Sequence, residues 1–157
     1  MNYKVTDSEI LHYGKVFDLK VDTLIYDSGN KGIREIAVHK GGAVVVPITN
    51  EGKIVFVKQF RYPLQKFLLE LPAGKLEENE DPYVCAEREL TEETGYISTN
   101  IKPLGKIYTT PGFCTELLHI YLATSLTMHN YDREEGEFGM TVLELHPKEV
   151  VRRIMFG

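Results

Sequence analysis

Acidic side chains are concentrated between residues 74 and 96, the part of this chain best suited to do chemistry. Seven of these 23 residues are glutamate. Four of the glutamates form a tight cluster: Glu87, Glu89, Glu92 and Glu93. Like charges four residues apart destabilise an isolated helix by roughly 0.2–0.5 kcal/mol, so something must offset the repulsion. A hard divalent cation held by carboxylate oxygens is the simplest candidate, and a solvated acidic helix face is the alternative.

The same stretch carries the start and stop signals of a helix. Asp81 followed by Pro82 predicts an N-cap and a first helical residue, and Gly95 predicts the end. At about 100° per residue, a mostly apolar stripe faces a core: Tyr83, Ala86, Leu90 and Thr94. Glu89 and Glu93, four residues apart, share the flank beside this stripe. The helix therefore presents paired carboxylates next to its buried face.

The spacing of the fixed residues resembles a known motif. Gly74, five residues, Glu80, seven residues and the run Arg88 to Gly95 match the pattern GX5EX7REUXEEXGU of the Nudix hydrolases, where U is aliphatic. The last position departs mildly, because Tyr96 stands where an aliphatic residue is usual. The chain thus resembles the Nudix hydrolases, which cleave diphosphate bonds.

This resemblance implies a metal site and its ligands. Glu89 and Glu93 match the positions that ligate metal, with Glu92 as a third ligand or bridging neighbour and the Ala73 carbonyl as a further ligand. The expected cofactor is Mg²⁺, with Mn²⁺ possible, since Mg²⁺ is bound through one or two carboxylates and keeps several waters. Such cations neutralise the diphosphate, activate a water and stabilise the leaving group. Arg88 and Glu80 are expected to organise the site rather than to bind metal.

The substrate is indicated by the segment from Tyr108 to Glu116. Pro111 lies 16 residues after Gly95, and the pattern Y-x-x-P-G-x-x-x-E resembles ADP-ribose pyrophosphatases within the Nudix family. This implies that Glu116 is an acid near the metals and the diphosphate. Pro-Gly is also an ordinary turn dipeptide, and Glu116 can equally be the polar start of a strand.

Three upstream features agree with this resemblance. Arg34 and Glu35 match a pair that reaches the ligand of the partner subunit in dimeric members, and Arg61 matches a phosphate contact. Phe17 is the candidate for stacking on the adenine. Each has a plain alternative: Arg34 and Arg61 as surface charges, and Phe17 as a core residue.

The general base is expected on a loop beyond the box, where members of the family place a glutamate that closes over the substrate. The candidates are Glu135 and Glu134, ahead of Glu137 in the run from Asp132. In the alternative, Glu93 itself acts as the base.

The elements that must position these residues are mostly strands. Residues 3–40 predict an antiparallel sheet with a hairpin turn at 27–32, and residues 41–157 predict the core. Further strands are expected at 43–48, 53–62, 67–71, 105–108, 117–124 and 140–145, with a short helix from Pro147. The class is α+β. The resemblance implies a Nudix α/β/α sandwich with a mixed sheet, in one domain over 1–157, and an N-terminal sheet that forms a homodimer.

Composition restricts the partners. The net charge of −5 argues against nucleic acid, which requires a basic surface. No apolar run approaches the roughly 20 residues that span a bilayer, and no signal-peptide pattern is present, so we expect a cytoplasmic protein without a membrane partner. Cys85 and Cys114 do not suggest a disulfide framework.

Together these features predict Mg²⁺-dependent hydrolysis of ADP-ribose to AMP and ribose 5-phosphate, with a small nucleoside diphosphate sugar as the ligand. The alternatives are another substrate (ADP-glucose, GDP-mannose or a nucleoside triphosphate) and a non-catalytic nucleotide-sugar sensor. A sensor would be expected to have a broken motif or an attached DNA-binding domain, and this sequence has neither.

Overall fold

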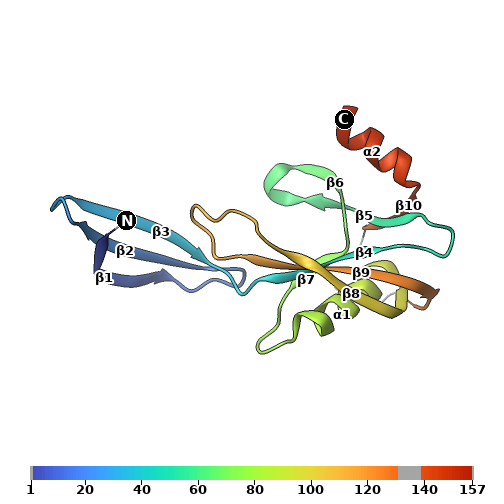
Figure 1. Cartoon of the computed structure of the whole chain (residues 1–157), viewed down its shortest axis with the longest axis horizontal. Helices are drawn as coiled ribbons and strands as arrows, with labels where there is room; N and C mark the ends of the chain where they lie inside the picture. The colour runs from blue at the N-terminus through green and yellow to red at the C-terminus, as the bar shows by residue number, and fades with distance from the viewer. Residues whose placement is uncertain (1, 131–138, 157) are drawn as a thin grey trace. The chain divides into compact units, whose positions relative to one another are not determined.

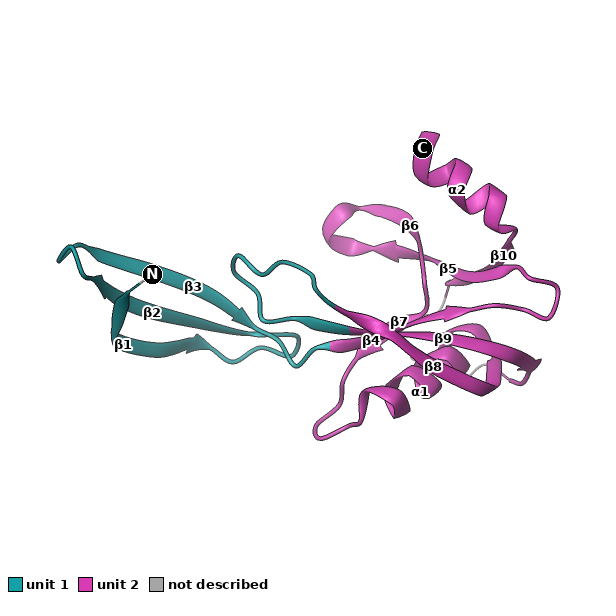
Figure 2. Ribbon diagram, in the orientation of Figure 1, with its two compact units in different colours: residues 1–41, 107–118 teal, residues 42–106, 119–157 magenta. Residues whose placement is uncertain are grey.

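The computed structural model describes residues 2–130 and 139–156, which form two compact units (Figures 1 and 2). Unit 1 contains residues 1–41 and 107–118, and unit 2 contains residues 42–106 and 119–157. The division after Gly41 lies next to the boundary expected at residue 40. Residues 107–118, which the sequence assigned to the core, cluster with the N-terminal residues instead.

Unit 1 is built on an antiparallel sheet of order β1-β2-β3, with bounds β1 Tyr3–His12, β2 Asp18–Tyr26 and β3 Lys31–Val38. The expected hairpin is confirmed: β2 and β3 pair from Asp18↔Val38 to Ile25↔Lys31. Gly29 in the connecting turn has φ +85, a value that glycine tolerates better than other residues. Every residue of β1 is exposed, so this strand is an unprotected edge within the chain.

Unit 2 contains two sheets, of order β7-β4-β9-β8 and β10-β5-β6. The bounds are β4 Gly42–Pro47, β5 Ile54–Arg61, η1 Tyr62–Leu64, β6 Lys66–Glu70, β7 Ala73–Lys75, α1 Pro82–Thr94, β8 Tyr96–Tyr108, β9 Leu117–Met128, β10 Thr141–Leu145 and α2 Pro147–Phe156. The outer ends of β8 and β9 belong to unit 1. The core joins α1 to strands β4, β5 and β9, with Val45, Val55 and Leu90 fully buried.

Helix α1 follows its local signals closely. The Asp81 side chain accepts a hydrogen bond from the Tyr83 N–H at 2.8 Å, and Gly95 ends the helix with φ 72. Ala86, Leu90 and Thr94 have no exposed surface, as the stripe predicted. Tyr83 departs from it: 38% of this residue is exposed, and its ring packs edge-to-face against Tyr121 at the margin of the core.

Two strands differ from the sequence expectations. Strand β8 begins at Tyr96, directly after α1, and not at Gly105. The earlier start was missed because the residues before Gly105 are largely polar and include Pro103. Strand β7 was not expected, and it is only three residues long. It pairs with β4 through Val44↔Ala73 and so places the first residue of the acidic motif in a sheet. Helix α2 begins at Pro147 as expected and has no buried residue. No helix among the described residues is long and apolar enough to cross a membrane.

Candidate active site

The acidic motif folds so that Glu89 lies directly against Gly74. A methyl group added to Gly74 would overlap with the Glu89 carboxylate. Only 6% of Glu89 is exposed, because α1 packs against β4 and β7. The glycine at this position therefore provides room for a carboxylate that the helix brings to the sheet.

Glu93 lies one helical turn further along and is 3% exposed. Its Oε2 accepts a hydrogen bond from the Ala73 N–H at 3.0 Å. The structure thus brings together three of the predicted metal-site residues, Glu89, Glu93 and Ala73, from strand β7 and helix α1. Whether the Ala73 carbonyl binds metal is a separate prediction, since the observed contact uses its amide.

Arg88 organises the remaining carboxylates, as the sequence suggested. Its guanidinium donates to Glu80 (2.9 Å), Glu89 (2.7 Å) and Glu92 (2.9 Å). The hydrogen bond to Glu80 is the main reason why the pKa of Arg88 is raised, and the same bond lowers the pKa of Glu80. Four carboxylates, counting Glu93, against one guanidinium leave a formal charge of −3 when all are ionised.

The chemistry of this donor set fits a hard divalent cation. The donors are carboxylate oxygens with excess negative charge, and the missing Cβ of Gly74 leaves room for one of them, that of Glu89. Within residues 2–130 and 139–156, no three acidic, histidine or cysteine side chains are already arranged around one metal position. The same nitrogen of Arg88 donates to the carboxylates of Glu89 and Glu92. Binding a cation there requires these carboxylates to turn from the guanidinium toward the metal.

Arg61, the predicted phosphate contact, ends strand β5 and pairs with Glu70 of β6. Its Nε lies 2.9 Å and 3.1 Å from the two carboxylate oxygens of Glu70. This pairing is the main cause of the raised pKa of Arg61, and the charge of Glu93 adds to it. The Arg61 side chain remains 44% exposed, so the guanidinium is accessible to an anion.

Cys85 lies on the buried side of α1 and is not a nucleophile. Burial raises the pKa of its thiol to about 12. A thiolate is therefore scarce at neutral pH.

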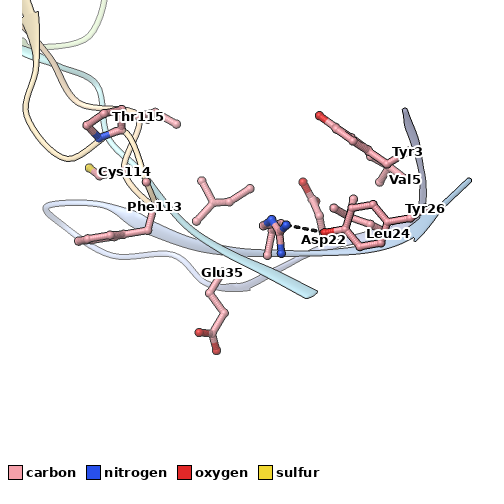
Figure 3. A pocket seen from close by; sticks show the side chains of 13 residues that line it. Tyr3, Val5, Asp22, Leu24, Tyr26, Glu35, Phe113, Cys114 and Thr115 are labelled. Carbon is pink, nitrogen blue, oxygen red and sulfur yellow. Dashed lines mark hydrogen bonds between the residues drawn. The ribbon is translucent and has the colours of Figure 1, made fainter. Parts of the chain in front are cut away.

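Unit 1 contains a pocket of about 350 Å³ that brings together three predicted substrate residues: Arg34, Glu35 and Pro111 (Figure 3). It is lined by β1, β2 and β3 and by residues 111–115. The Glu35 carboxylate points away from Tyr26 and Asp22 in Figure 3, as expected because neighbouring residues of a strand face opposite sides. Arg34 is therefore the member of this pair directed toward Tyr26.

Several residues of this pocket were missed from the sequence. Tyr3 and Tyr26 line it, whereas Phe17, the predicted stacking residue, does not and is 45% exposed. The Arg34 guanidinium donates to the Tyr26 hydroxyl and lies 6.0 Å from the centre of its ring. Tyr26 could have been found from the register of the β2–β3 hairpin. Asp22 of β2 pairs with Arg34 of β3, and Tyr26, four residues after Asp22, lies on the same face of β2.

The remaining predicted residues lie apart from this pocket. Glu116 does not line it, and accepts a hydrogen bond from the Thr109 hydroxyl at 2.6 Å. Glu134 and Glu135, the predicted base candidates, lie outside the described residues, and so does Glu137.

Comparison with known proteins identifies the family. The model of the NUDIX domain matches residues 39–154, and the chain belongs to the Nudix hydrolase family. The fold agrees: the structure superposes on a crystal structure of an ADP compounds hydrolase with a TM-score of 0.85, over 99% of this chain and 84% of that chain, at 16% identity. The predicted α+β Nudix fold is therefore confirmed.

Several relatives match nearly the whole chain, and two of them are from Bacillus. It is 40% identical over 153 residues to an ADP-ribose pyrophosphatase of Bacillus subtilis (strain 168), a match that covers 96% of this chain and 82% of that protein. It is 46% identical, over the same shares of the two chains, to a methanol dehydrogenase activator of Bacillus methanolicus.

Proposed function

We propose that this protein hydrolyses the diphosphate bond of ADP-ribose, giving AMP and ribose 5-phosphate, with Mg²⁺ as cofactor and Mn²⁺ as a substitute. The observation that carries the proposal is the pair of nearly buried carboxylates, Glu89 and Glu93, held against Gly74 and Ala73. The substrate is inferred from the Bacillus subtilis relative, which is named an ADP-ribose pyrophosphatase. Other nucleoside diphosphate sugars are the alternative.

Different residues of the chain would bind the metal and accept the proton. Glu89, Glu93, Glu92 and the Ala73 carbonyl would hold the metal, which neutralises diphosphate charge and lowers the pKa of a bound water. The oxygen of a water forms a bond to one phosphorus as the bridging P–O bond breaks, and a glutamate accepts the water proton. Glu135 or Glu134 is the proposed base, with Glu93 as the alternative.

Arg61 is proposed to bind the diphosphate. A guanidinium can bind a phosphate bidentately, as Nε and Nη2 of Arg61 now bind the two carboxylate oxygens of Glu70. The diphosphate would replace Glu70 in this contact. Electrostatic stabilisation of the developing charge would then come from Arg61 as well as from the metal.

The pocket of unit 1 is proposed to bind the nucleotide part of the substrate. Tyr26 and Tyr3 offer aromatic faces, and Arg34 supplies a positive charge beside them. Pro111 also lines this pocket. In a homodimer, Arg34 and Glu35 would reach the ligand of the partner subunit. Glu116, which lies outside the pocket, is proposed to lie near the metals and the diphosphate, and Phe17 remains a second stacking candidate.

We also infer a homodimer formed through the N-terminal sheet. Strand β1 is exposed along its whole length, and its apolar side chains include Val5 (45% exposed) and Leu11 (56% exposed). An exposed edge with apolar side chains is a surface suited to a second copy of the chain. The free thiols of Cys85 and Cys114 are in keeping with a reducing, cytoplasmic location.

A substrate panel tests the proposal. ADP-ribose, ADP-glucose, GDP-mannose and nucleoside triphosphates are incubated with Mg²⁺ and the protein, and phosphate is measured after phosphatase treatment, with enzyme-free reactions subtracted. The highest kcat/KM is expected for ADP-ribose. A clear preference for another compound would replace the substrate, and no turnover of any compound would overturn the hydrolase proposal.

A second candidate is activation of a dehydrogenase, because the relative at 46% identity is named a methanol dehydrogenase activator. A methanol dehydrogenase assayed with and without this protein tests it. Comparison with the Glu93→Gln variant shows whether any activation requires hydrolysis. Loss of activation in the variant would mean that the protein activates the dehydrogenase through its hydrolase activity. A non-catalytic sensor would bind the nucleotide sugar without turnover.

A further inference from the structure

The loop that carries Pro111 and Glu116 is attached to the end of strand β3 by a set of hydrogen bonds. Ala37 N–H donates to the Phe113 carbonyl at 2.8 Å, and Thr115 N–H donates to the Ala37 carbonyl at 3.0 Å. The Thr115 hydroxyl accepts from the His39 N–H at 2.8 Å and donates to the His39 carbonyl at 3.2 Å. The backbone around His39 therefore fixes the loop that the proposed function assigns to the substrate.

The His39 side chain extends this attachment to the carboxylate of Glu116. Only 7% of the imidazole is exposed, and its Nδ1 lies 3.6 Å from Oε1 of Glu116. The same Nδ1 accepts a hydrogen bond from the Gly41 N–H at 2.9 Å. The imidazole is therefore held in place by the Gly41 amide and lies directly beside the Glu116 carboxylate.

The other carboxylate oxygen of Glu116 is bound by Thr109. The Thr109 hydroxyl donates to Oε2 at 2.6 Å, and the Thr109 N–H donates to the Glu116 carbonyl at 3.3 Å. The carboxylate is thus bonded to Thr109 on one side and lies beside a buried imidazole on the other. Two contacts of this kind restrict a side chain that is 27% exposed.

We propose that His39 and Thr109 are positioning residues, which hold the Glu116 carboxylate in the orientation required by a diphosphate substrate. The proposal rests on the function proposed above, in which Glu116 contacts that substrate. His39 contacts two successive residues of the loop: its backbone binds Thr115, and its ring lies beside Glu116. Neither residue needs to touch the substrate.

A double-mutant cycle tests whether His39 acts through Glu116. His39→Leu keeps much of the volume but cannot accept from Gly41, so the side chain beside Glu116 is no longer held in place, whereas His39→Asn supplies an acceptor near the position of Nδ1. We expect His39→Leu to lower kcat/KM roughly tenfold, and to have an effect below about twofold when Glu116 is already alanine. His39→Asn should restore most of the activity. Equal losses in both backgrounds would overturn the proposal.

Thr109→Val provides a second test that does not endanger the fold, because Thr109 is exposed. It removes the hydroxyl and keeps the branched shape, and it should reproduce the loss and the coupling to Glu116. Thr127→Val, an exposed threonine of β9, is the matched control and should behave as wild type. Wild-type kinetics for Thr109→Val would contradict the proposal.

The two proposals fail in different ways. If wild type does not cleave ADP-ribose, the substrate proposal fails, and the cycle is measured on the diphosphate that the panel identifies. The same cycle read as the Kd of ADP-ribose in the presence of Ca²⁺ reports positioning even without turnover. Additive effects on Kd would overturn the positioning role regardless of the substrate.

Discussion

The carboxylate of Glu93 accepts a hydrogen bond from the main-chain amide of Ala73 at 3.0 Å, across 20 residues of sequence. This contact ties helix α1 to strand β7 at the start of the acidic motif. Because 3% of Glu93 is exposed, its charge is placed next to the sheet and not in bulk water. A buried carboxylate is stabilised by nearby positive charge, which is the physical basis for expecting a cation here.

Replacing Glu93 by glutamine tests its role in catalysis. The amide oxygen of a glutamine at this position can still accept from the Ala73 amide, so the fold should be retained, but the charge that binds metal is lost. We expect kcat to fall by roughly 10²–10⁴-fold, with a change in Tm of only a few degrees. Glu87→Gln, on the exposed side of the same helix, is the control and should keep wild-type turnover. Unchanged turnover in Glu93→Gln would remove Glu93 from the site.

Replacing Gly74 by alanine tests the space beside Glu89. The added methyl overlaps with the Glu89 carboxylate, which must move, and overpacking of this kind typically costs about 1–3 kcal/mol. We expect a lower free energy of unfolding in urea and a higher Mg²⁺ concentration for half-maximal activity. Gly105→Ala is the matched control, since its methyl would meet nothing within 4 Å. Equal Mg²⁺ requirements in wild type and Gly74→Ala would argue against a metal beside Glu89.

The ion pair between Glu80 and Arg88 predicts a pH dependence of stability. The hydrogen bond from Arg88 lowers the pKa of Glu80 below its ordinary value of 4.5. Its contribution is therefore complete above the unfolded pKa and is lost as the pH falls through the lower, folded pKa. Wild type should exceed Glu80→Gln in Tm near pH 7, and the difference should shrink as the pH falls below 4.5. A difference that does not change with pH would show that the charge of Glu80 is unimportant.

The exposed edge of unit 1 predicts how the dimer can be broken. Leu11→Glu places a charge on strand β1, which is exposed along its length, and should shift the protein toward monomer in light scattering after gel filtration. Leu104→Glu, at a similarly exposed leucine of β8 (57%), is the control and should leave the dimer intact. A wild-type protein that is monomeric at all concentrations would exclude the proposed homodimer.

The features predicted correctly from the sequence were those that are determined by residues close together in the chain. The bounds of α1 followed from Asp81, Pro82 and Gly95, because caps act over a few residues. That Glu89, Glu93 and Ala73 lie together followed from the resemblance of the spacing, not from periodicity alone, whereas the burial of the two carboxylates was not predicted. Strand β7 was not predicted, because three residues are too few to show an alternation of apolar and polar side chains.

The substrate pocket was predicted only in part, because it depends on strand pairing. Arg34, Glu35 and Pro111 were found through the family resemblance, and all three line the pocket. Tyr3 and Tyr26 were missed, since their proximity depends on the register of β1 and β2, which pairs these two residues directly. Side chains brought together by register carry no signal at a fixed spacing in the sequence.

The most direct test of the central claim is hydrolysis of ADP-ribose in ¹⁸O-labelled water, with the products analysed by mass spectrometry. Wild type with Mg²⁺ should give equimolar AMP and ribose 5-phosphate, with one ¹⁸O atom incorporated into only one of the two phosphates. Chelation of the metal and the Glu93→Gln substitution should each abolish the products. Absence of these products with the wild-type protein, or their formation at the same rate by Glu93→Gln, would contradict the account.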